Sequence, residues 1–340
     1  MTSTTTLKPA SRRISTMIKT WIRLLYVTFY NEDNTYSVTI GKTTDDSKKP
    51  AIVVTGNKYL SLVKDNFTIK IYNLPYKNLI DIMERKLFRV QIYAGYLNNQ
   101  DPTNFEAKKL FDGGVINIVN DKRDWRDNVA TFVCASRFVA KAQEWRCNIT
   151  FASGINLYSA INYIGSRAGM TNMNISNDFK YRFKSAVSSA ESTPISYLDE
   201  ISNEDNQYFF NSDGSEDSEI TAVNVGNQAL RIIDIEASKG MIIGDAPELT
   251  SSGLTWESLP VYNYMPGDLC KIDNSLINLA SGADTFSGAQ STPNAVYMSK
   301  QGYYYIFDLS YNLSNTNGQF MIKLHCKSKY LFDNVTSGNL

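Results

Sequence analysis

The sequence contains a single histidine, His325, among its 340 residues. Catalytic and zinc sites draw heavily on histidine, so any site that needs several of them is excluded. His325 lies between Leu324 and Cys326, on the polar side of a predicted strand, and we interpret it as an exposed strand histidine. A Ser–His–Asp or Cys–His arrangement would need partners from distant parts of the chain, and no GxSxG motif is present.

Cysteine is also scarce. The four cysteines, at positions 134, 147, 270 and 326, lack the CxxC spacing of metal and redox motifs. We therefore expect free thiols that act as small buried hydrophobes in a reducing compartment. Net charge is absent as well, since 34 basic residues balance 34 acidic ones. A dedicated nucleic-acid binder carries a basic excess, so that class is disfavoured.

Long apolar runs are missing. The longest, such as residues 51–54, fall far short of the roughly 20 residues that a membrane-spanning helix needs. No apolar segment follows the basic part of the first 20 residues, so we expect neither a signal peptide nor stable membrane insertion. The glycine-rich phosphate-binding motifs of nucleotide sites are also absent.

The acidic residues form no catalytic or metal-binding pattern. Asp199-Glu200 and Glu204-Asp205 are expected to face solvent rather than to form a paired-carboxylate site. The acidic run at residues 213–219 lacks the ligand order and the glycine position of an EF-hand loop. The sequence therefore predicts a protein that is not an enzyme, with no catalytic residue, no cofactor and no metal.

Tyrosine and phenylalanine are abundant, with 21 and 16 residues against 4 tryptophans. Tyrosine suits half-buried strands and protein–protein contacts, because its ring is apolar while its hydroxyl can stay in water. Gly113-Gly114 interrupts one predicted strand, where we expect a bulge. The alternation of apolar and polar residues that is typical of strands occurs at residues 25–29, 67–71 and 88–92, and further strands are expected at 110–119 and 129–138.

Helical spacing appears at three places. Ser153 is the expected N-cap of one helix, which Gly169 would end. Thr193-Pro194 would open a further helix, with Tyr208–Phe210 as a strand after it, so the middle of the chain is mixed α/β. The apolar residues of the three helices are Leu79, Ile80, Met83 and Leu87, then Leu157, Ile161, Ile164 and Ala168, then Ile195, Leu198 and Ile201.

Strands return after residue 230. Residues 303–311 keep an apolar period of two, and residues 320–326 do the same. Asn317-Gly318 between them is a strong turn dipeptide, so the pair predicts a β-hairpin. We divide the chain into a basic arm at 1–21, a first β-domain at 22–140, an α/β insert at 141–227, a second β-domain at 228–330 and a tail at 331–340.

Several stretches, taken in order, resemble the central baseplate hub family of contractile-tailed bacteriophages. The family's IxIYNL, VxIxAGY and LFxGxI strands are matched at 67–74, 90–96 and 110–116. Residues 157–169 and 193–210 resemble its helical insert. Residues 233–244 resemble its SAxTGLIG segment, although Lys239-Gly240-Met241 replaces Thr-Gly-Leu, and 266–275 resemble its PGD segment. The motif positions expected to be structural are Asn73, Leu74, Gly95, Tyr96, Gly114, Gly240, Gly244, Pro266, Gly267, Asp268 and Asn274.

The resemblance implies a mainly β protein, with two tube-like β-barrel domains flanking a smaller α/β domain. It implies a homotrimeric ring that joins the sixfold tail tube to the threefold central spike in a virion tail baseplate assembled in host cytoplasm. The implied partners are the tail tube protein, the central spike protein, other baseplate proteins and the tape-measure protein. DNA would pass through the lumen without sequence-specific binding.

Two alternatives remain open. A tail-associated receptor- or carbohydrate-binding module would use the Tyr303-Tyr304-Tyr305 run as a stacking platform. A cell-wall hydrolase carried in the baseplate would need an acid pair in a cleft, which the sequence does not indicate. The basic arm at 1–21 is either flexible or ordered on an acidic neighbouring surface.

Overall fold

The computed structural model covers the chain in fifteen stretches, and the fold below concerns these alone. The described residues are 22–43, 49–59, 65–97, 105–123, 127–142, 147–167, 173–175, 187–192, 208–211, 220–224, 231–250, 253–279, 299, 301–316 and 318–328. The predicted arm at 1–21 and tail at 331–340 lie outside them. So do the helix expected from Thr193, its neighbouring acid pairs, the acidic run at 213–219, Gly169 and Asn317.

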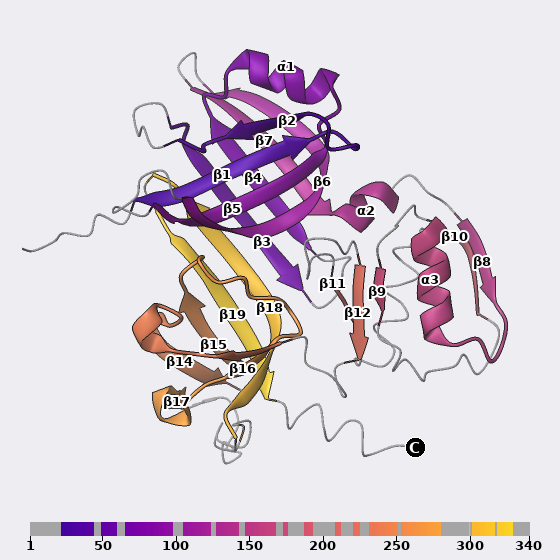
Figure 1. The fold of residues 1–340 in the computed structure, drawn as a ribbon, viewed down its shortest axis with the longest axis vertical. Helices are drawn as coiled ribbons and strands as arrows, with labels where there is room; N and C mark the ends of the chain where they lie inside the picture. The colour runs from indigo at the N-terminus through magenta and orange to yellow at the C-terminus, as the bar shows by residue number, and fades with distance from the viewer. Residues whose placement is uncertain are drawn as a thin grey trace, which may run out of the picture.

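One large sheet dominates the structure, which confirms a mainly β protein (Figure 1). Within this sheet, the described neighbouring strands are antiparallel except for the pairs β13–β16 and β14–β17. In spatial order the main path is β17 (Asn278–Leu279), β14 (Ile243–Thr250), β15 (Gly253–Ser258), β19 (Phe320–Ser328), β18 (Tyr303–Ser314), β3 (Ile52–Tyr59), β4 (Asn66–Tyr72), β7 (Asp127–Ser136), β6 (Phe105–Arg123), β5 (Arg89–Leu97), β1 (Arg23–Tyr30) and β2 (Ser37–Ile40). Beside this path, β13 (Ile232–Asp234) pairs with β16 (Leu269–Lys271), and β16 pairs with β18.

Strand β18 pairs with strands from both the N-terminal and the C-terminal parts of the chain. Its first residues pair with β16, and its later residues, from Asp308 to Ser314, pair with β3. The predicted uninterrupted period of two along 303–311 is wrong, because the register with β19 shifts at Phe307. The bulge moves the core-facing side from Tyr304 and Ile306 to Leu309 and the alternate residues after it. The β18–β19 hairpin itself is confirmed.

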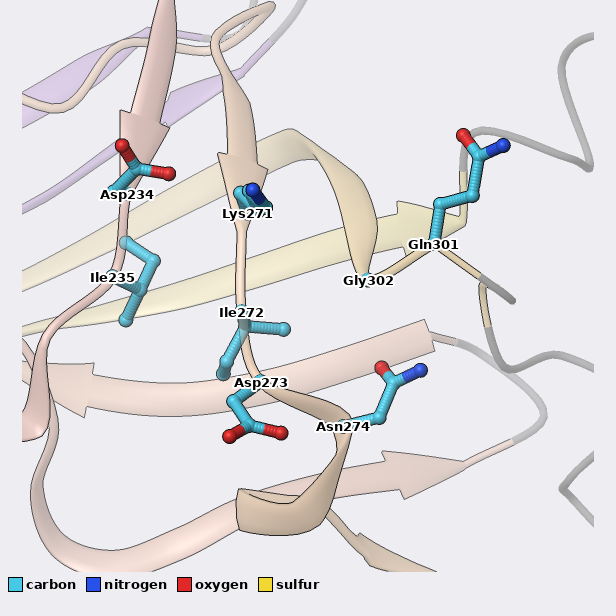
Figure 2. A pocket seen from close by; sticks show the side chains of 8 residues that line it. All are labelled: Asp234, Ile235, Lys271, Ile272, Asp273, Asn274, Gln301 and Gly302. Carbon is cyan, nitrogen blue, oxygen red and sulfur yellow. The ribbon is translucent and has the colours of Figure 1, made fainter.

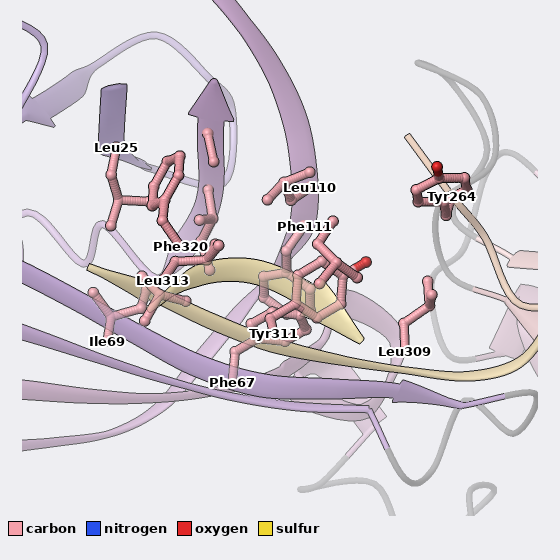
Figure 3. Close-up of a cluster of buried hydrophobic side chains, with 14 of the residues drawn as sticks. Leu25, Phe67, Ile69, Leu110, Phe111, Tyr264, Leu309, Tyr311, Leu313 and Phe320 are labelled. Atoms are coloured by element: carbon pink, nitrogen blue, oxygen red, sulfur yellow. The ribbon is translucent and has the colours of Figure 1, made fainter. Parts of the chain in front are cut away.

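A single hydrophobic core runs beneath this shared strand (Figure 3). The ring of Phe67 on β4 stacks on Phe111 of β6, with centroids 4.2 Å apart, and lies 5.1 Å from Tyr311 of β18. Tyr96 of β5 meets Phe320 of β19 edge-on at 5.4 Å. Aromatic side chains therefore connect residues from the predicted first and second β-domains inside one core.

Strand β1 differs from its prediction. The alternation at 25–29 suggested a half-buried strand, but Tyr26 and Thr28 are buried along with the apolar residues. The side chain of Tyr26 stacks on Tyr93 of β5, with ring centroids 4.7 Å apart. Thr28 hydrogen-bonds Thr39 of β2. Neighbouring strands thus cover the polar face of β1 as well, through contacts that the alternation of a single strand does not encode.

The predicted short helix is present as α1 (Tyr76–Glu84), which follows Pro75. Its buried residues are Leu79 and Ile82, whereas Met83 is 52% exposed, so part of the expected apolar face was wrong. Leu87, beyond the end of the helix, is buried in the core. Because the helix has only nine residues, a small error in the predicted orientation of its apolar face changes which side chains are expected to be buried.

The paired glycines of β6 have a different role from the expected bulge. Register shifts in β6 fall at Leu110 and Ile116, on either side of Gly113-Gly114. A Cβ atom at Gly114 would lie 2.3 Å from the Cβ of Ala140, in a helix that the sequence did not indicate, α2 (Arg137–Ala142). Glycine at 114 therefore lets α2 lie directly against the sheet.

The middle of the chain forms smaller units to one side of the large sheet (Figure 1). Helix α3 (Leu157–Arg167) is confirmed, but its N-cap is Asn156 rather than Ser153, since the Asn156 Oδ1 accepts from the Ser159 N–H at 2.8 Å. Two short 3₁₀ turns, η3 (Ala237–Lys239) and η4 (Asn274–Leu276), lie among the later strands. The small sheets are β8 (Cys147–Phe151) with β10 (Val187–Ser192), and β9 (Met173–Ile175) with β12 (Ile220–Asn224) and β11 (Tyr208–Asn211).

The structure describes the side chains of three of the four cysteines. Cys134, Cys270 and Cys326 are buried free thiols, as predicted, and the side chain of Cys147 lies outside the described set. Burial keeps the pKa of the Cys134 thiol well above its usual value, which makes it an unreactive core residue. Among the helices of the described ranges, none is long and apolar enough to cross a membrane.

Candidate functional site

The first motif positions fix the end of strand β4. Asn73 adopts a left-handed backbone conformation with φ of 53°, which asparagine tolerates better than most residues. Its backbone N–H donates to the Asn128 carbonyl at 2.7 Å, and its Oδ1 accepts from the Asn128 N–H at 3.1 Å. Leu74 follows as a buried core residue. The Asn73–Asn128 hydrogen bonds therefore join the end of β4 to the start of β7, and Leu74 leads the chain toward α1.

Strands β5 and β6 hold the next motif positions. Gly95 is buried in the sheet, opposite Leu24 of β1. Tyr96 packs on Phe320, and burial raises the pKa of its hydroxyl. Gly114 has no side chain, which leaves room for Ala140 of α2 against the strand. All three positions therefore act in packing between the strands.

Later motif glycines occupy turns. Gly240 ends η3 with φ of 76°, and Gly244, with φ of 69°, lies near the start of β14. Asn274 opens η4, and its Nδ2 donates to the Ser299 carbonyl at 2.9 Å. Side chains other than glycine are strained at such φ values, so the two glycines are explained by backbone conformation.

The Pro266-Gly267-Asp268 turn contains a buried carboxylate. Arg231 reaches Asp268 with two nitrogens, Nε to Oδ1 at 3.0 Å and Nη2 to Oδ2 at 2.5 Å. The Met265 N–H donates to the same carboxylate at 2.9 Å, and the Gly267 N–H donates to the Ile306 carbonyl of β18 at 2.9 Å. Burial raises the pKa of Asp268 although Arg231 opposes the shift. The turn is thereby fixed against β18, close to the bulge.

The motif positions do not gather into one site. The contacts join Asn73 to Asn128, Tyr96 to Phe320 and Asp268 to Arg231, at separate places in the fold. Their family-derived role as structural positions stays a prediction.

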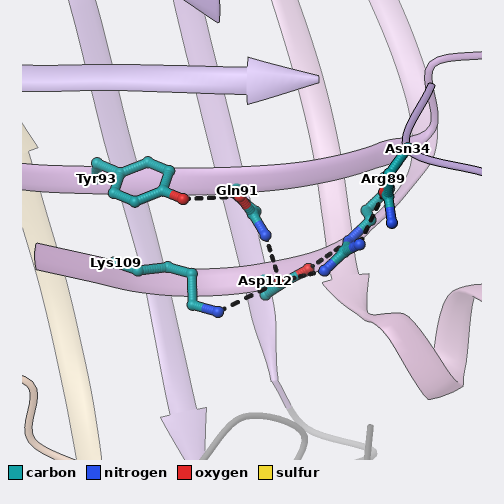
Figure 4. A network of polar contacts seen from close by, with 6 residues as sticks. All are labelled: Asn34, Arg89, Gln91, Tyr93, Lys109 and Asp112. Atoms are coloured by element: carbon teal, nitrogen blue, oxygen red, sulfur yellow. Dashed lines mark hydrogen bonds and ion pairs between the residues drawn. The ribbon is translucent and has the colours of Figure 1, made fainter. Parts of the chain in front are cut away.

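A second bidentate pair lies on β5 and β6 (Figure 4). Arg89 donates to both oxygens of Asp112, at 3.0 and 2.8 Å, and to the Asn34 Oδ1 at 2.8 Å. Gln91 donates to Asp112 at 2.6 Å and accepts from the Tyr93 hydroxyl at 2.7 Å. Burial alone would raise the pKa of Asp112, but these donors lower it below its usual value. An ionised carboxylate held this way is a structural anchor, not a proton acceptor poised near neutral pH.

The sequence reasoning missed two buried charged residues on the β3–β4 hairpin. Lys58 is 1% exposed and Asp65 is 2% exposed. A signal was available, since residues 52, 54, 56 and 58 share one face of β3 and the first two are core residues. A lysine on such a face is unusual, because burying an ammonium is costly without an acidic partner.

Two of the hollows on the described surface are lined by residues named above. One, of about 450 Å³, is lined by polar groups around Asp273, Asn274 and Gln301, with Asp234 on the far side of Ile235 and Ile272 (Figure 2). Its side chains spread apart rather than converge, and the Asp273 carboxylate already accepts from the Ser275 N–H. No group of three or more His, Cys, Asp or Glu side chains suited to a metal ion occurs among the residues described.

The second hollow, of about 810 Å³, adjoins an open sheet edge. Strand β5 begins at Arg89, opposite Gly114, so residues 116–123 of β6 pair only with β7 in the part of the chain that the structure describes. Ile116 and Val119 on this stretch are 39% and 47% exposed. An unpaired edge with exposed apolar residues is typical of a strand that pairs with another chain.

Two features on β18 and β19 bear on the alternatives. His325 is half-buried rather than exposed as predicted, and its Nδ1 lies 2.8 Å from Asp308 Oδ2. Tyr304 and Tyr305 are buried, and the Tyr304 hydroxyl accepts from the Ser299 N–H. A buried ring cannot stack on a sugar, so two of the three rings in this run cannot form an open platform.

Comparisons with known proteins identify the fold. No family model and no curated protein matches the sequence. Solved structures do match. One is c3393, an Escherichia coli component of the type VI secretion system, with a TM-score of 0.53 at 9% identity over 82% of this chain and 73% of that one. That protein is described as structurally similar to the T4 bacteriophage tail proteins gp27 and gp5. A Neisseria meningitidis tail protein gives 0.52 at 7%, covering 91% and 98%, and a 43 kDa tail protein of the Shewanella oneidensis prophage MuSo2 gives 0.50 at 7%, covering 90% and 97%. The chain therefore has the fold seen in phage tail and type VI secretion proteins.

Proposed function

We propose that the protein is a structural subunit of a phage tail baseplate, a hub that forms a trimeric ring between the sixfold tail tube and the threefold central spike. The observation that carries the proposal is a fold shared with two tail proteins over nine-tenths or more of this chain. Its tube, spike, baseplate and tape-measure partners, and the passage of DNA through its lumen, belong to this proposal.

The polar groups of the described residues favour a structural role. Asp112 and Asp268 are each held by a bidentate arginine, and His325 is paired with Asp308. Each of these groups supports packing between strands. A sugar-binding role for the tyrosine run is disfavoured by burial of Tyr304 and Tyr305.

The open edge of β6 offers a contact surface for a second copy of the chain. Closed rings of identical chains remove exposed strand edges, which otherwise template aggregation. Ile116 and Val119 would be covered in such a contact.

We expect the purified protein, or the protein extracted from assembled tails, to have three times the 38.3 kDa mass of the chain. Native mass spectrometry or light scattering measures this directly. A monomer under both conditions would contradict the trimer.

The double variant Ile116→Lys, Val119→Lys should shift the oligomer toward monomer by at least about tenfold in association constant, because two charges would have to be desolvated at the contact. Tyr76→Lys, at a 68% exposed position on α1, is the matched control and should leave assembly unchanged. Equal effects of the two variants would place the contact elsewhere.

A further inference from the structure

Strand β13 has an open edge, as the stretch of β6 beyond residue 115 does. In the part of the chain that the structure describes, β13 pairs only with its parallel neighbour β16 (Figure 2). Two backbone hydrogen bonds to β16 use the carbonyl of Arg231 and the N–H of Ile235. Because alternate residues of a strand point their backbone groups to the same neighbour, the N–H and C=O groups of Ile232 and Asp234 point away from β16.

The side chains at this edge are exposed. Ile232 is 64% exposed, the highest value among the large aliphatic side chains that the structure describes. Asp234 lies two residues further on the same face of the strand and is exposed as well. Ile233, on the other face, packs against the core. The edge of β13 therefore presents an apolar side chain and then an acidic one to a neighbouring molecule.

The hollow beside the open edge of β6 has side chains that suit this pattern. Its apolar surface includes Phe88 and Ile116, which are 43% and 39% exposed. The bases Arg85 and Lys86, at the end of α1, also line it and are exposed. The acids at 32–33 line it from the turn after β1. A strand added to β6 here would meet apolar surface and a basic side chain next to it.

The two edges lie on different sides of the junction between β3 and β18. In the sheet order β6 lies beyond β3, and β13 is reached from β18 through β16. A contact between two different surfaces leaves each assembly with one free surface of either kind, so further copies add head to tail until a ring closes. A contact of the β6 edge with itself would stop at two copies. A trimeric ring therefore needs a head-to-tail contact, and the chain has two unlike edges for it.

We propose that β13 of one copy adds as a strand to residues 116–120 of β6 in the next copy. Ile232 of the first copy packs on Phe88 and Ile116 of the second, and Asp234 pairs with Lys86. The inference rests on the proposed trimeric ring, and it assigns the surface that covers the open edge of β6.

Cross-linking between introduced cysteines tests this contact in the full chain, with a short bis-maleimide as the reagent. The three described native thiols are buried, and the unmodified chain treated in the same way controls for reaction of the native cysteines. A mixture of Ile116→Cys and Ile232→Cys chains should give a covalent dimer of twice the 38.3 kDa chain mass. The double variant should give a covalent trimer, because each copy then has both reactive positions.

Each single variant alone should give no covalent product, since the contact joins two different positions. Tyr76→Cys, at a 68% exposed position on α1, replaces Ile116→Cys in the matched control and should give no product with Ile232→Cys. A covalent dimer from Ile116→Cys alone would overturn the inference in favour of a β6–β6 contact. Native mass spectrometry of the same samples separates the two proposals: a trimer without the mixed product overturns this contact alone, whereas a monomer throughout overturns the ring itself.

Reversal of charge tests the polar part of the contact. Asp234→Lys should weaken the association of copies by about fivefold, because a base would then face Lys86. Adding Lys86→Glu should restore the association, since the pair is re-formed with its charges exchanged. Equal weakening in the single and the double variant would overturn the pairing of these two residues.

Discussion

Replacing Asp268 with alanine should lower the free energy of unfolding by about 3 kcal/mol, measured by chemical denaturation. The substitution removes the two carboxylate oxygens that accept from Arg231 and the acceptor of the Met265 N–H, and leaves Arg231 only its bond to the Asn263 carbonyl. The figure lies at the low end for broken buried pairs, because the Arg231 side chain is itself 44% exposed and water can replace part of what is lost.

Asp245→Ala provides the control for this measurement, since Asp245 is an exposed acid on β14, away from the turn in the sheet order. It should change the unfolding free energy by less than about 0.5 kcal/mol. If Asp268→Ala were equally mild, the Pro266–Asp268 turn would owe its position to backbone hydrogen bonds such as Gly267 N–H to Ile306 and to packing, not to the carboxylate.

Replacing Phe67 with alanine should cost about 4 kcal/mol, because it empties space between the rings of Phe111 and Tyr311. Gly56 lies against the same ring, so no neighbouring side chain can fill the void from that side. Since Tyr311 comes from the C-terminal strands, the loss should also appear in the unfolding of that part. We expect one cooperative transition, shifted as a whole, in calorimetry or denaturant unfolding.

Two resolved transitions, with only the first moved by Phe67→Ala, would show that the N-terminal and C-terminal strands unfold independently. Met83→Ala on α1 serves as the comparison, because Met83 is about half exposed and should cost less than about 1 kcal/mol.

Local patterns in the sequence predicted individual strands well. The alternation at 67–71 matches β4, where Phe67, Ile69 and Ile71 are buried and the residues between them are not. The turn dipeptide and two alternating runs predicted the β18–β19 hairpin. These features depend on neighbours in the chain, so a single sequence contains the information they need.

What could not be predicted depends on distant partners. The burial of Tyr26 comes from stacking on Tyr93, and the glycine at 114 is explained by Ala140 of an unexpected helix. The bulge at Phe307 lies where β18 changes its partner from β16 to β3, a change that no local pattern encodes. Lys58 was detectable as a charge on a core-facing position, but its neighbour Asp65 became evident only through the pairing of strands.

The sharing of β18 also sets an order for how the chain can acquire its structure during synthesis. Asn57 and Ser310, which hydrogen-bond between β3 and β18, are 253 positions apart. Until residues 303–314 leave the ribosome, β3 can pair only with β4. The edge of β3 that later pairs with β18 therefore stays exposed. Such long-range closure is intrinsically slow and exposes the nascent chain to aggregation. The N-terminal strands can therefore complete their pairing only after residues 303–314 have been made.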